Sequence, residues 1–292
     1  MTAKLGLGTV QWGIPYGVAN RSGMTSEDEV SRILAKATAL GVDLLDTAAG
    51  YGRAEAVLGR HDLSPFRVVT KTPSFKSATV GSEQARAVEE SLRQSLLTLR
   101  LSQVYGLLVH HADDLLVSGG DALIAILQGL KAQGLVRKIG VSIYQDEQLE
   151  EVLARFIPDI VQLPLNVLDQ RLIINGRLQQ LKGLGVEIHV RSVFLQGLLL
   201  MDPADVPSHF APISPLLKIW HERVREQGMS PVQAALSFVR DLPWVDIVLT
   251  GVDSSAQFCQ CAEDFVVPGS FDASGLGCND PAFVNPAEWK LK

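Results

Sequence analysis

Eight short runs of aliphatic and β-branched residues recur along this chain of 292 residues, each followed by a longer segment with helical periodicity. Most runs are continuously apolar, which is typical of parallel strands that helices cover on both faces. No break in composition and no low-complexity linker interrupts the alternation. The pattern predicts an α/β chain folded as one (β/α)8 TIM barrel domain over residues 1–292, with strands at 5–8, 42–47, 67–70, 104–109, 138–142, 160–163, 186–192 and 245–250.

Helix boundaries are marked between these runs. Ser26 and Glu29 form a capping-box pattern at the start of the first helix. Gly41 follows that helix, where a left-handed residue commonly ends one, and the same helix–Gly–strand junction recurs at Gly134 and Gly185. The first helix, between Ser26 and Gly41, is expected to bury one apolar stripe, made of Val30, Ile33, Leu34, Ala37 and Leu40.

A doubly wound sheet is the main competing fold. Its glycine-rich turn would need three glycines after a strand, and the nearest match, from Gly6 through Gly8 to Gln11, lacks the third. The interval 192–245 has room for a long loop and a helix after the seventh strand. The segment 266–292 is irregular, rich in Gly, Pro, Asn and Asp, and is expected to pack near a barrel mouth.

Composition narrows the function classes. Lys+Arg 26 against Asp+Glu 32 gives a net charge of −6, which argues against a nucleic-acid surface. Apolar runs such as 193–201 are far shorter than the roughly 20 residues that span a bilayer. The start of the chain has no apolar signal region, so we expect a cytoplasmic protein. Three cysteines fit a reducing compartment, and no motif indicates a metal site.

Four ionisable side chains fall at the ends of three consecutive predicted strands. Asp46 and Tyr51 follow the second strand, Lys71 the third and His110 the fourth. Function in such barrels lies at the carboxyl ends of the strands. Neighbouring strands are about 4.7–4.9 Å apart, so these side chains can converge. His111 is expected to point elsewhere and to have a structural role.

The types of these residues indicate a proton donor aimed at a carbonyl oxygen. A tyrosine has a pKa of about 10, and an adjacent ammonium such as Lys71 favours the phenolate and lowers that pKa. Asp46 would keep the ammonium charged and oriented, and His110 would donate a hydrogen bond to the substrate oxygen. Protonation is half of a carbonyl reduction. The other half, a hydride, must come from a cofactor.

The chain resembles the aldo-keto reductases over nearly its whole length, from about residue 5 to 265. The resemblance rests on six segments in the family's order: Asp46-Thr-Ala-Ala-Gly-Tyr51-Gly52 with Glu55 and Leu58-Gly59, then Val69-Thr70-Lys71, Leu107-Leu108-Val109-His110, Ile139-Gly140-Val141-Ser142, the Gln162…Asn166 pair, and Ser192-Val-Phe-Leu-Gln-Gly197-Leu.

The resemblance implies roles for individual positions. Tyr51 would be the general acid, Lys71 would tune its pKa, Asp46 would hold the lysine and His110 would orient the carbonyl. The implied contacts to a nicotinamide dinucleotide are Gly8, Thr9, Ser142, Gln162, Arg191, Ser192, Phe194, Gln196, Gly197, Gly251, Asp253 and Gln257.

Three departures from the family pattern matter. Ile143 stands where Asn is usual after the serine, and Arg191 stands where an aromatic residue often stacks on the nicotinamide. A guanidinium can also stack, or it can reach a phosphate or a substrate anion. The segment 250–257 has Asp253 and no Lys or Arg. NADP(H) is the family habit, but these residues suggest that NAD(H) is accepted or preferred.

The resemblance predicts an enzyme that reduces an aldehyde or ketone to an alcohol, or runs the reverse reaction. Trp12 and Tyr16, after the first strand, are expected to line the substrate pocket with His110. Sugar-like polyols are one candidate class, and the sequence does not indicate the oligomeric state. Two alternatives stay open: a nicotinamide-binding redox sensor or regulatory subunit with slow turnover, and a barrel lyase that uses Lys71 as a Schiff base.

Overall fold

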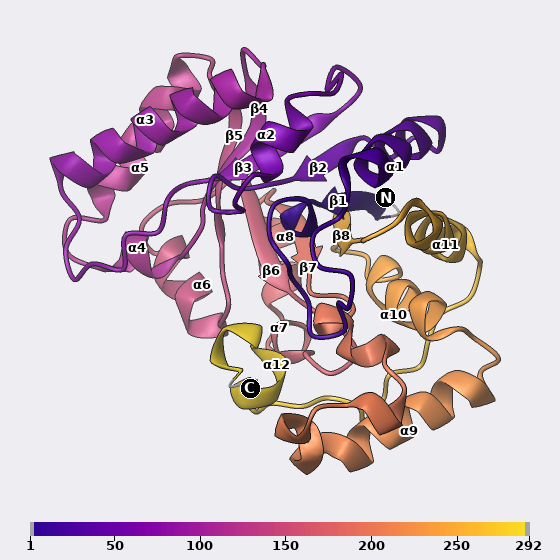
Figure 1. Cartoon of the computed structure of the whole chain (residues 1–292). Helices are drawn as coiled ribbons and strands as arrows, with labels where there is room; N and C mark the ends of the chain where they lie inside the picture. The colour runs from indigo at the N-terminus through magenta and orange to yellow at the C-terminus, as the bar shows by residue number, and fades with distance from the viewer. Residues whose placement is uncertain (1–2, 290–292) are drawn as a thin grey trace.

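Eight parallel strands close into a barrel in sequence order, as predicted (Figure 1). The computed structural model describes residues 3–289. No strand end differs from its predicted position by more than two residues. The strands are β1 (Lys4–Gly8), β2 (Leu44–Asp46), β3 (Arg67–Lys71), β4 (Val104–Val109), β5 (Val136–Ser142), β6 (Ile160–Pro164), β7 (Glu187–Arg191) and β8 (Ile247–Gly251).

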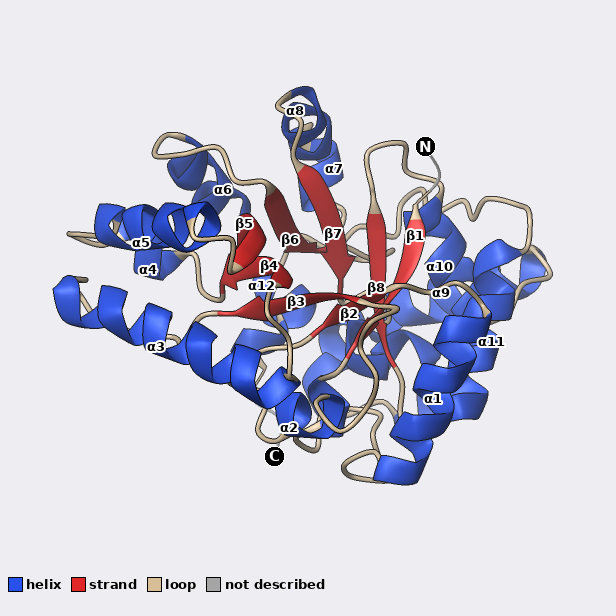
Figure 2. Ribbon diagram, turned by 90° about the horizontal axis from the view of Figure 1, so that it is seen from above, coloured by secondary structure: helices blue, strands red, loops and turns tan. Residues whose placement is uncertain are grey.

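Helices surround the strands on the outside of the barrel (Figure 2). After β7 the chain makes 3-10 turns and two longer helices, α9 and α10, where a loop and one helix were expected. The α-helices are α1 (Glu27–Ala39), α2 (Ala54–Leu58), α3 (Ser82–Leu99), α4 (Asp113–Leu116), α5 (Asp121–Ala132), α6 (Asp146–Leu153), α7 (Arg171–Ile174), α8 (Arg177–Gly183), α9 (Ser214–Glu226), α10 (Pro231–Arg240), α11 (Ser255–Val266) and α12 (Pro281–Val284).

Helix α1 shows which local predictions hold. The Ser26 hydroxyl accepts the Glu29 backbone N–H at 3.3 Å, as a capping residue does. The return half of the capping box is absent, because a Glu29 carboxylate oxygen accepts the backbone N–H of Ser255, at the start of α11, at 2.6 Å. Leu40 is 56% exposed because α1 ends before it. Gly41 is left-handed with φ +71°, as expected.

Two apolar layers build the core. Inside the barrel, glycines stand beside large residues: a Cβ on Gly106 would lie 3.0 Å from the Ile160 side chain, and one on Gly6 would lie 3.0 Å from Ile247. Small and large residues thus fill the narrow interior together. The second layer lies between the strands and the helices, where the apolar stripes of α1 and α3 are buried.

The segment after α11 crosses over α9 toward the loop that follows β6 (Figure 1). Phe271 packs edge-on against Trp220, with ring centroids 5.1 Å apart. The Cys278 N–H donates to the carbonyl oxygen of Leu168 at 2.7 Å. Leu168 follows β6, so this contact lies toward the carboxyl end of the barrel. Residues 290–292 of the expected tail lie outside the described part of the chain.

Within residues 3–289, no helix has the length and apolar character needed to cross a bilayer. The same residues contain no cluster of three or more His, Cys, Asp or Glu side chains able to hold a metal ion.

Candidate active site

The four side chains expected to act together meet at the carboxyl ends of β2, β3 and β4. Lys71 Nζ lies 2.7 Å from Asp46 Oδ2. It also lies 4.8 Å from the centre of the Tyr51 ring. The Tyr51 and His110 rings pack edge to face, with centroids 5.7 Å apart. The strand ends therefore bring a phenol, an ammonium, a carboxylate and an imidazole into one cluster.

Two glycines set the position of Tyr51. A Cβ on Gly13 would lie 1.7 Å from the Tyr51 carbonyl oxygen, so only glycine lets the loop after β1 pack directly on this turn. Gly52 is left-handed with φ +56°, and a Cβ there would lie 2.5 Å from the Gly13 oxygen. This close backbone contact holds the turn between β2 and α2 in place.

The Lys71–Asp46 pair is buried, and both of its members make further hydrogen bonds. The side chains are 1% and 7% exposed, respectively. Lys71 Nζ also donates to the Thr47 carbonyl oxygen at 2.9 Å, and Gln162 Nε2 donates to the second oxygen of Asp46 at 2.6 Å. Burial lowers the pKa of Lys71, and the charge and hydrogen bond of Asp46 oppose that effect. The ammonium is thus held by the carboxylate and a carbonyl.

Burial makes Tyr51 a weaker acid than an exposed tyrosine. Desolvation, together with the negative charge of Asp46, raises the pKa of Tyr51 well above its ordinary value. Lys71 is expected to favour the phenolate, but the net direction of the pKa is upward, because burial and the carboxylate dominate. Near neutral pH the group is a phenol that holds its proton.

His110 is a neutral imidazole near neutral pH. Burial and the nearby positive charge of Lys71 lower the pKa of His110 to about 3. A neutral imidazole carries one N–H and can donate one hydrogen bond from it. Tyr51 and His110 are thus two neutral donors that lie beside a buried ion pair.

The expected cofactor residues lie around the ends of β1, β5, β6, β7 and β8. Gly8 and Gly251 are register partners at the adjacent ends of β1 and β8. After β7, Ser192, Gln196 and Gly197 have φ values of +62°, +55° and +91°. Left-handed residues following right-handed ones can turn backbone N–H groups to one side and form an anion-binding concavity. This backbone suits a phosphate, and the Gln11 amide lies directly beside Gly251, where a Cβ would be 2.3 Å from its nitrogen.

Several expected cofactor contacts are used within the protein. The Thr9 hydroxyl is buried and donates to the Asp46 carbonyl oxygen at 3.0 Å. Gln162 joins the ion pair described above. Gln257 Oε1 accepts the Asp253 N–H at 2.7 Å. These three residues therefore organise the strand ends and the start of α11.

Of the two aromatic residues expected to line the substrate pocket, only Tyr16 is accessible. Trp12 lies in the hydrophobic core with 0% exposure, so it presents no surface to a substrate. Tyr16 is 39% exposed. Its hydroxyl accepts a hydrogen bond from Gln196 Nε2 at 3.2 Å. The loop after β1 thus touches the loop after β7 (Figure 1).

Sequence reasoning missed a row of side chains next to His110. The His111 ring stacks on His110 with centroids 4.8 Å apart, although it was expected to point elsewhere. Tyr144 lies 5.9 Å from His111 and parallel to it, with an interplanar angle of 7°. Arg191 Cζ lies 4.2 Å from the Tyr144 ring centre. Tyr144 comes directly after Ser142 and Ile143, at the carboxyl end of a strand. That position could have identified it as a candidate site residue from the sequence.

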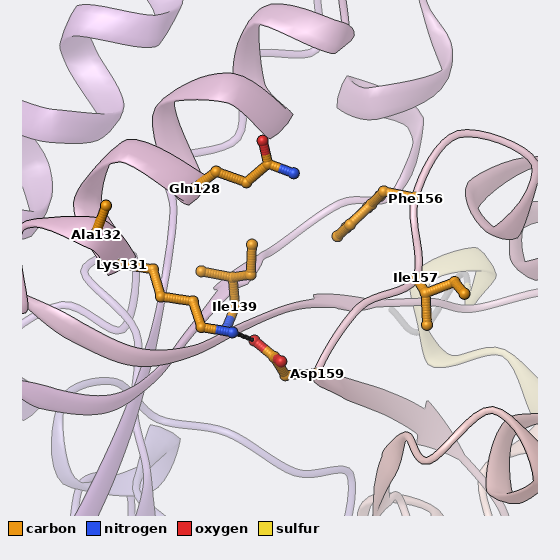
Figure 3. Close-up of a pocket in the computed structure, with 7 residues that line it drawn as sticks. All are labelled: Gln128, Lys131, Ala132, Ile139, Phe156, Ile157 and Asp159. Carbon is orange, nitrogen blue, oxygen red and sulfur yellow. Dashed lines mark hydrogen bonds and ion pairs between the residues drawn. The ribbon is translucent and has the colours of Figure 1, made fainter.

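A hollow of about 410 Å³ lies away from this cluster, between α5, β5 and the start of β6 (Figure 3). Its charged groups, Lys131 and Asp159, form an ion pair at 2.6 Å. Asp159 precedes β6, so the hollow opens at the amino end of the barrel. Its charges already neutralise each other, and it holds none of the reactive groups described above.

A family model described as "Aldo/keto reductase family" matches residues 4–268. The NADH-specific methylglyoxal reductase of Escherichia coli (strain K12) is 27% identical over 216 residues, which cover 68% of this chain and 65% of that protein. The L-galactose dehydrogenase of Arabidopsis thaliana is 28% identical over 256 residues, which cover 80% of this chain and 77% of that protein.

Solved structures show the same fold at low sequence identity. An aldo-keto reductase from Bacillus halodurans, in its holo form, superposes with a TM-score of 0.72 at 21% identity, covering 91% of this chain and 88% of that one. A glycerol dehydrogenase from Gluconobacter oxydans gives a TM-score of 0.70 at 21% identity, and the match covers 93% of this chain and 88% of that one.

Proposed function

This chain belongs to the aldo/keto reductase family of oxidoreductases, and we propose that it reduces a small aldehyde or ketone with NAD(P)H, or oxidises the corresponding alcohol. One observation carries the proposal: Tyr51 and His110 lie together beside the buried Lys71–Asp46 ion pair. The bound nicotinamide would supply or accept the hydride, which no side chain can do.

Tyr51 would protonate the carbonyl oxygen in the direction of reduction. Its raised pKa keeps the phenol protonated until negative charge develops on the substrate oxygen. Proton donation leaves a phenolate in a buried site, and the Lys71 ammonium close to the ring would stabilise it. Asp46 and the Thr47 carbonyl oxygen hold that ammonium in place.

His110 would act as the second donor to the same oxygen. Its pKa of about 3 keeps the imidazole neutral near neutral pH, so it adds a hydrogen bond without adding a charge. Two neutral donors that converge on one oxygen orient the carbonyl and favour the developing alkoxide.

A lyase that uses Lys71 as a Schiff base is less well supported. Schiff-base chemistry needs a free amine with an available lone pair. Lys71 Nζ lies 2.7 Å from the Asp46 carboxylate, and that negative charge favours the ammonium over the free amine. Borohydride with a carbonyl substrate should therefore leave the mass of the protein unchanged.

A substrate panel read by the absorbance of the reduced nicotinamide tests the function. The printed names of two relatives make methylglyoxal and L-galactose sensible first choices. We expect turnover with at least one aldehyde or sugar, with NADH or NADPH. The absence of turnover across small aldehydes, ketones and sugar alcohols with both cofactors would contradict the proposal.

We expect NADH to bind more tightly than NADPH. Segment 250–257 has no cation, and Glu29 accepts the Ser255 N–H at the start of α11, where a helix could hold a phosphate. A 2′-phosphate there would meet the like charges of Glu29 and Asp253 with no cation in the segment to offset them. Fluorescence titration should give a preference of about tenfold or more, which corresponds to about 1.4 kcal/mol or more.

Replacing Glu29 by Gln should narrow the preference for NADH over NADPH. Of the two carboxylates near the start of α11, Glu29 and Asp253, only Asp253 then keeps its charge. Ser31→Ala, on the exposed part of α1, is a matched control that should leave the preference unchanged. NADPH binding tenfold more tightly than NADH in the wild type would show the assignment to be wrong.

A further inference from the structure

Arg191 is a half-buried cation without a counterion. It ends β7, where Nη2 donates to the Ile143 carbonyl oxygen at 3.0 Å and Nη1 to the Ser192 hydroxyl at 3.2 Å. Among residues 3–289, no carboxylate lies within ion-pair distance of it. A guanidinium has five N–H donors, so most of its hydrogen-bonding capacity is unused within this part of the chain.

Among the charged groups of the site, Arg191 therefore has no counterion within residues 3–289. Lys71 is neutralised by Asp46 at 2.7 Å, and His110 is uncharged near neutral pH. A partly buried charge is costly unless it is paired. Burial raises the pKa of Tyr51, and the positive charge of Arg191 opposes that effect. The charge of Arg191 thus acts on the group proposed to donate the proton.

Arg191 and the loop that follows it reach in opposite directions around the barrel. The loop contacts the segment after β1, where Ala19 N–H donates to the Gln196 carbonyl oxygen at 3.4 Å. Arg191 crosses β6 toward the end of β5, at Ile143 and Tyr144. The guanidinium therefore reaches the end of β5, and it also contacts Ser192, the first residue of the loop proposed to hold the cofactor's pyrophosphate.

A continuous row of rings joins Arg191 to the proposed proton donor. The row runs from Tyr51 to His110, His111 and Tyr144, with centroid distances of 5.7, 4.8 and 5.9 Å. Arg191 stacks on its last member at 4.2 Å. Stacking fixes the plane of a guanidinium and leaves its edge free to bind. The positive charge of Arg191 acts on both Tyr51 and His110, so a substrate bound among these groups would meet donors for its carbonyl and a cation.

We infer that Arg191 binds an oxyanion of the substrate, so that this enzyme acts on carbonyl compounds that also carry a carboxylate or a phosphate. The planar fork of a guanidinium matches both groups with two parallel hydrogen bonds. This inference rests on the proposed function and narrows its substrate class. It also accounts for an arginine at a position where the family often has an aromatic residue.

Matched pairs of aldehydes test the inference. Succinic semialdehyde and butanal share a four-carbon chain and differ in the carboxylate, and glyceraldehyde 3-phosphate and glyceraldehyde differ in the phosphate. We expect the wild type to favour the charged member of at least one pair in kcat/KM by about 10- to 100-fold, which is the effect of charge-assisted hydrogen bonds. The pair with the larger ratio identifies the oxyanion.

Arg191→Met keeps an unbranched side chain as far as the fourth heavy atom and removes the guanidinium with its charge, and it should bring that ratio close to one. Arg191→Lys should restore part of the preference, because the charge returns without the planar fork. Arg137→Met is the matched control: it removes the same charge from an exposed residue near the amino end of β5, and the ratio should stay as in the wild type. An unchanged ratio in Arg191→Met would overturn the inference.

Two binding measurements separate the possible failures. Butyrate binding that is lost in Arg191→Met supports the oxyanion contact even if no aldehyde is turned over, and then only the reductase proposal fails. A large loss of cofactor affinity in Arg191→Met, with an unchanged ratio between the charged and neutral aldehydes, assigns the guanidinium to a cofactor phosphate and overturns the inference.

Discussion

Replacing Tyr51 by Phe should lower kcat for carbonyl reduction by about 10²- to 10⁴-fold, the range for loss of a positioned general acid. Phe lacks the hydroxyl that would donate the proton and keeps the ring that packs against His110. Steady-state rates at saturating cofactor and substrate measure the effect. Cofactor affinity should stay near the wild-type value, because none of the proposed cofactor contacts is removed.

The thermal unfolding of Tyr51→Phe serves as its control. The turn that carries Tyr51 is set by backbone contacts with Gly13, which this substitution leaves intact. We expect the melting temperature to change little, so that a loss of turnover reflects chemistry. Turnover within a few-fold of the wild type would show that Tyr51 is not the proton donor.

Replacing Lys71 by Met should affect both stability and turnover. The substitution leaves the Asp46 carboxylate buried, with only the Gln162 amide as a side-chain partner. Removing one member of a buried ion pair typically costs about 3–5 kcal/mol in the free energy of unfolding. Turnover should also fall by orders of magnitude, because no ammonium then stabilises the Tyr51 phenolate. Denaturant unfolding and steady-state kinetics measure the two effects separately.

The double variant Asp46→Asn with Lys71→Met separates the two roles of the lysine. A neutral amide at position 46 removes the unpaired charge, so most of the lost stability should return. Turnover should not return, because the ammonium is still missing. Recovery of both properties in the double variant would mean that Lys71 has a purely structural role.

Sequence periodicity was sufficient to predict the barrel and the convergence of its reactive groups. All eight strands lie within two residues of the predicted positions, because a strand buried on both faces produces a continuous apolar run. Asp46, Lys71 and His110 lie at consecutive strand ends, so closing the barrel in sequence order necessarily makes them neighbours. The topology alone brings these three groups together.

The features that sequence reasoning missed arise from contacts between distant segments. The Glu29 carboxylate accepts the N–H of Ser255, 226 residues away, instead of completing the cap of its own helix. No local sequence pattern predicts that contact. Trp12 looked like a pocket residue because it follows β1, but its ring packs into the core. The pKa of Tyr51 depends on how deeply the barrel buries it. Position along a strand does not give that depth.

The hydrogen bond between Gln162 and Asp46 links β6 to β2, two strands on opposite sides of the closed ring. A half-barrel made of the first four strands could place Asp46, Lys71 and His110 near one another, yet it would lack the amide that completes the carboxylate's coordination. The proposed site is therefore complete only when the barrel is closed. Duplication or exchange of half-barrels during evolution would have to preserve this contact across the diameter.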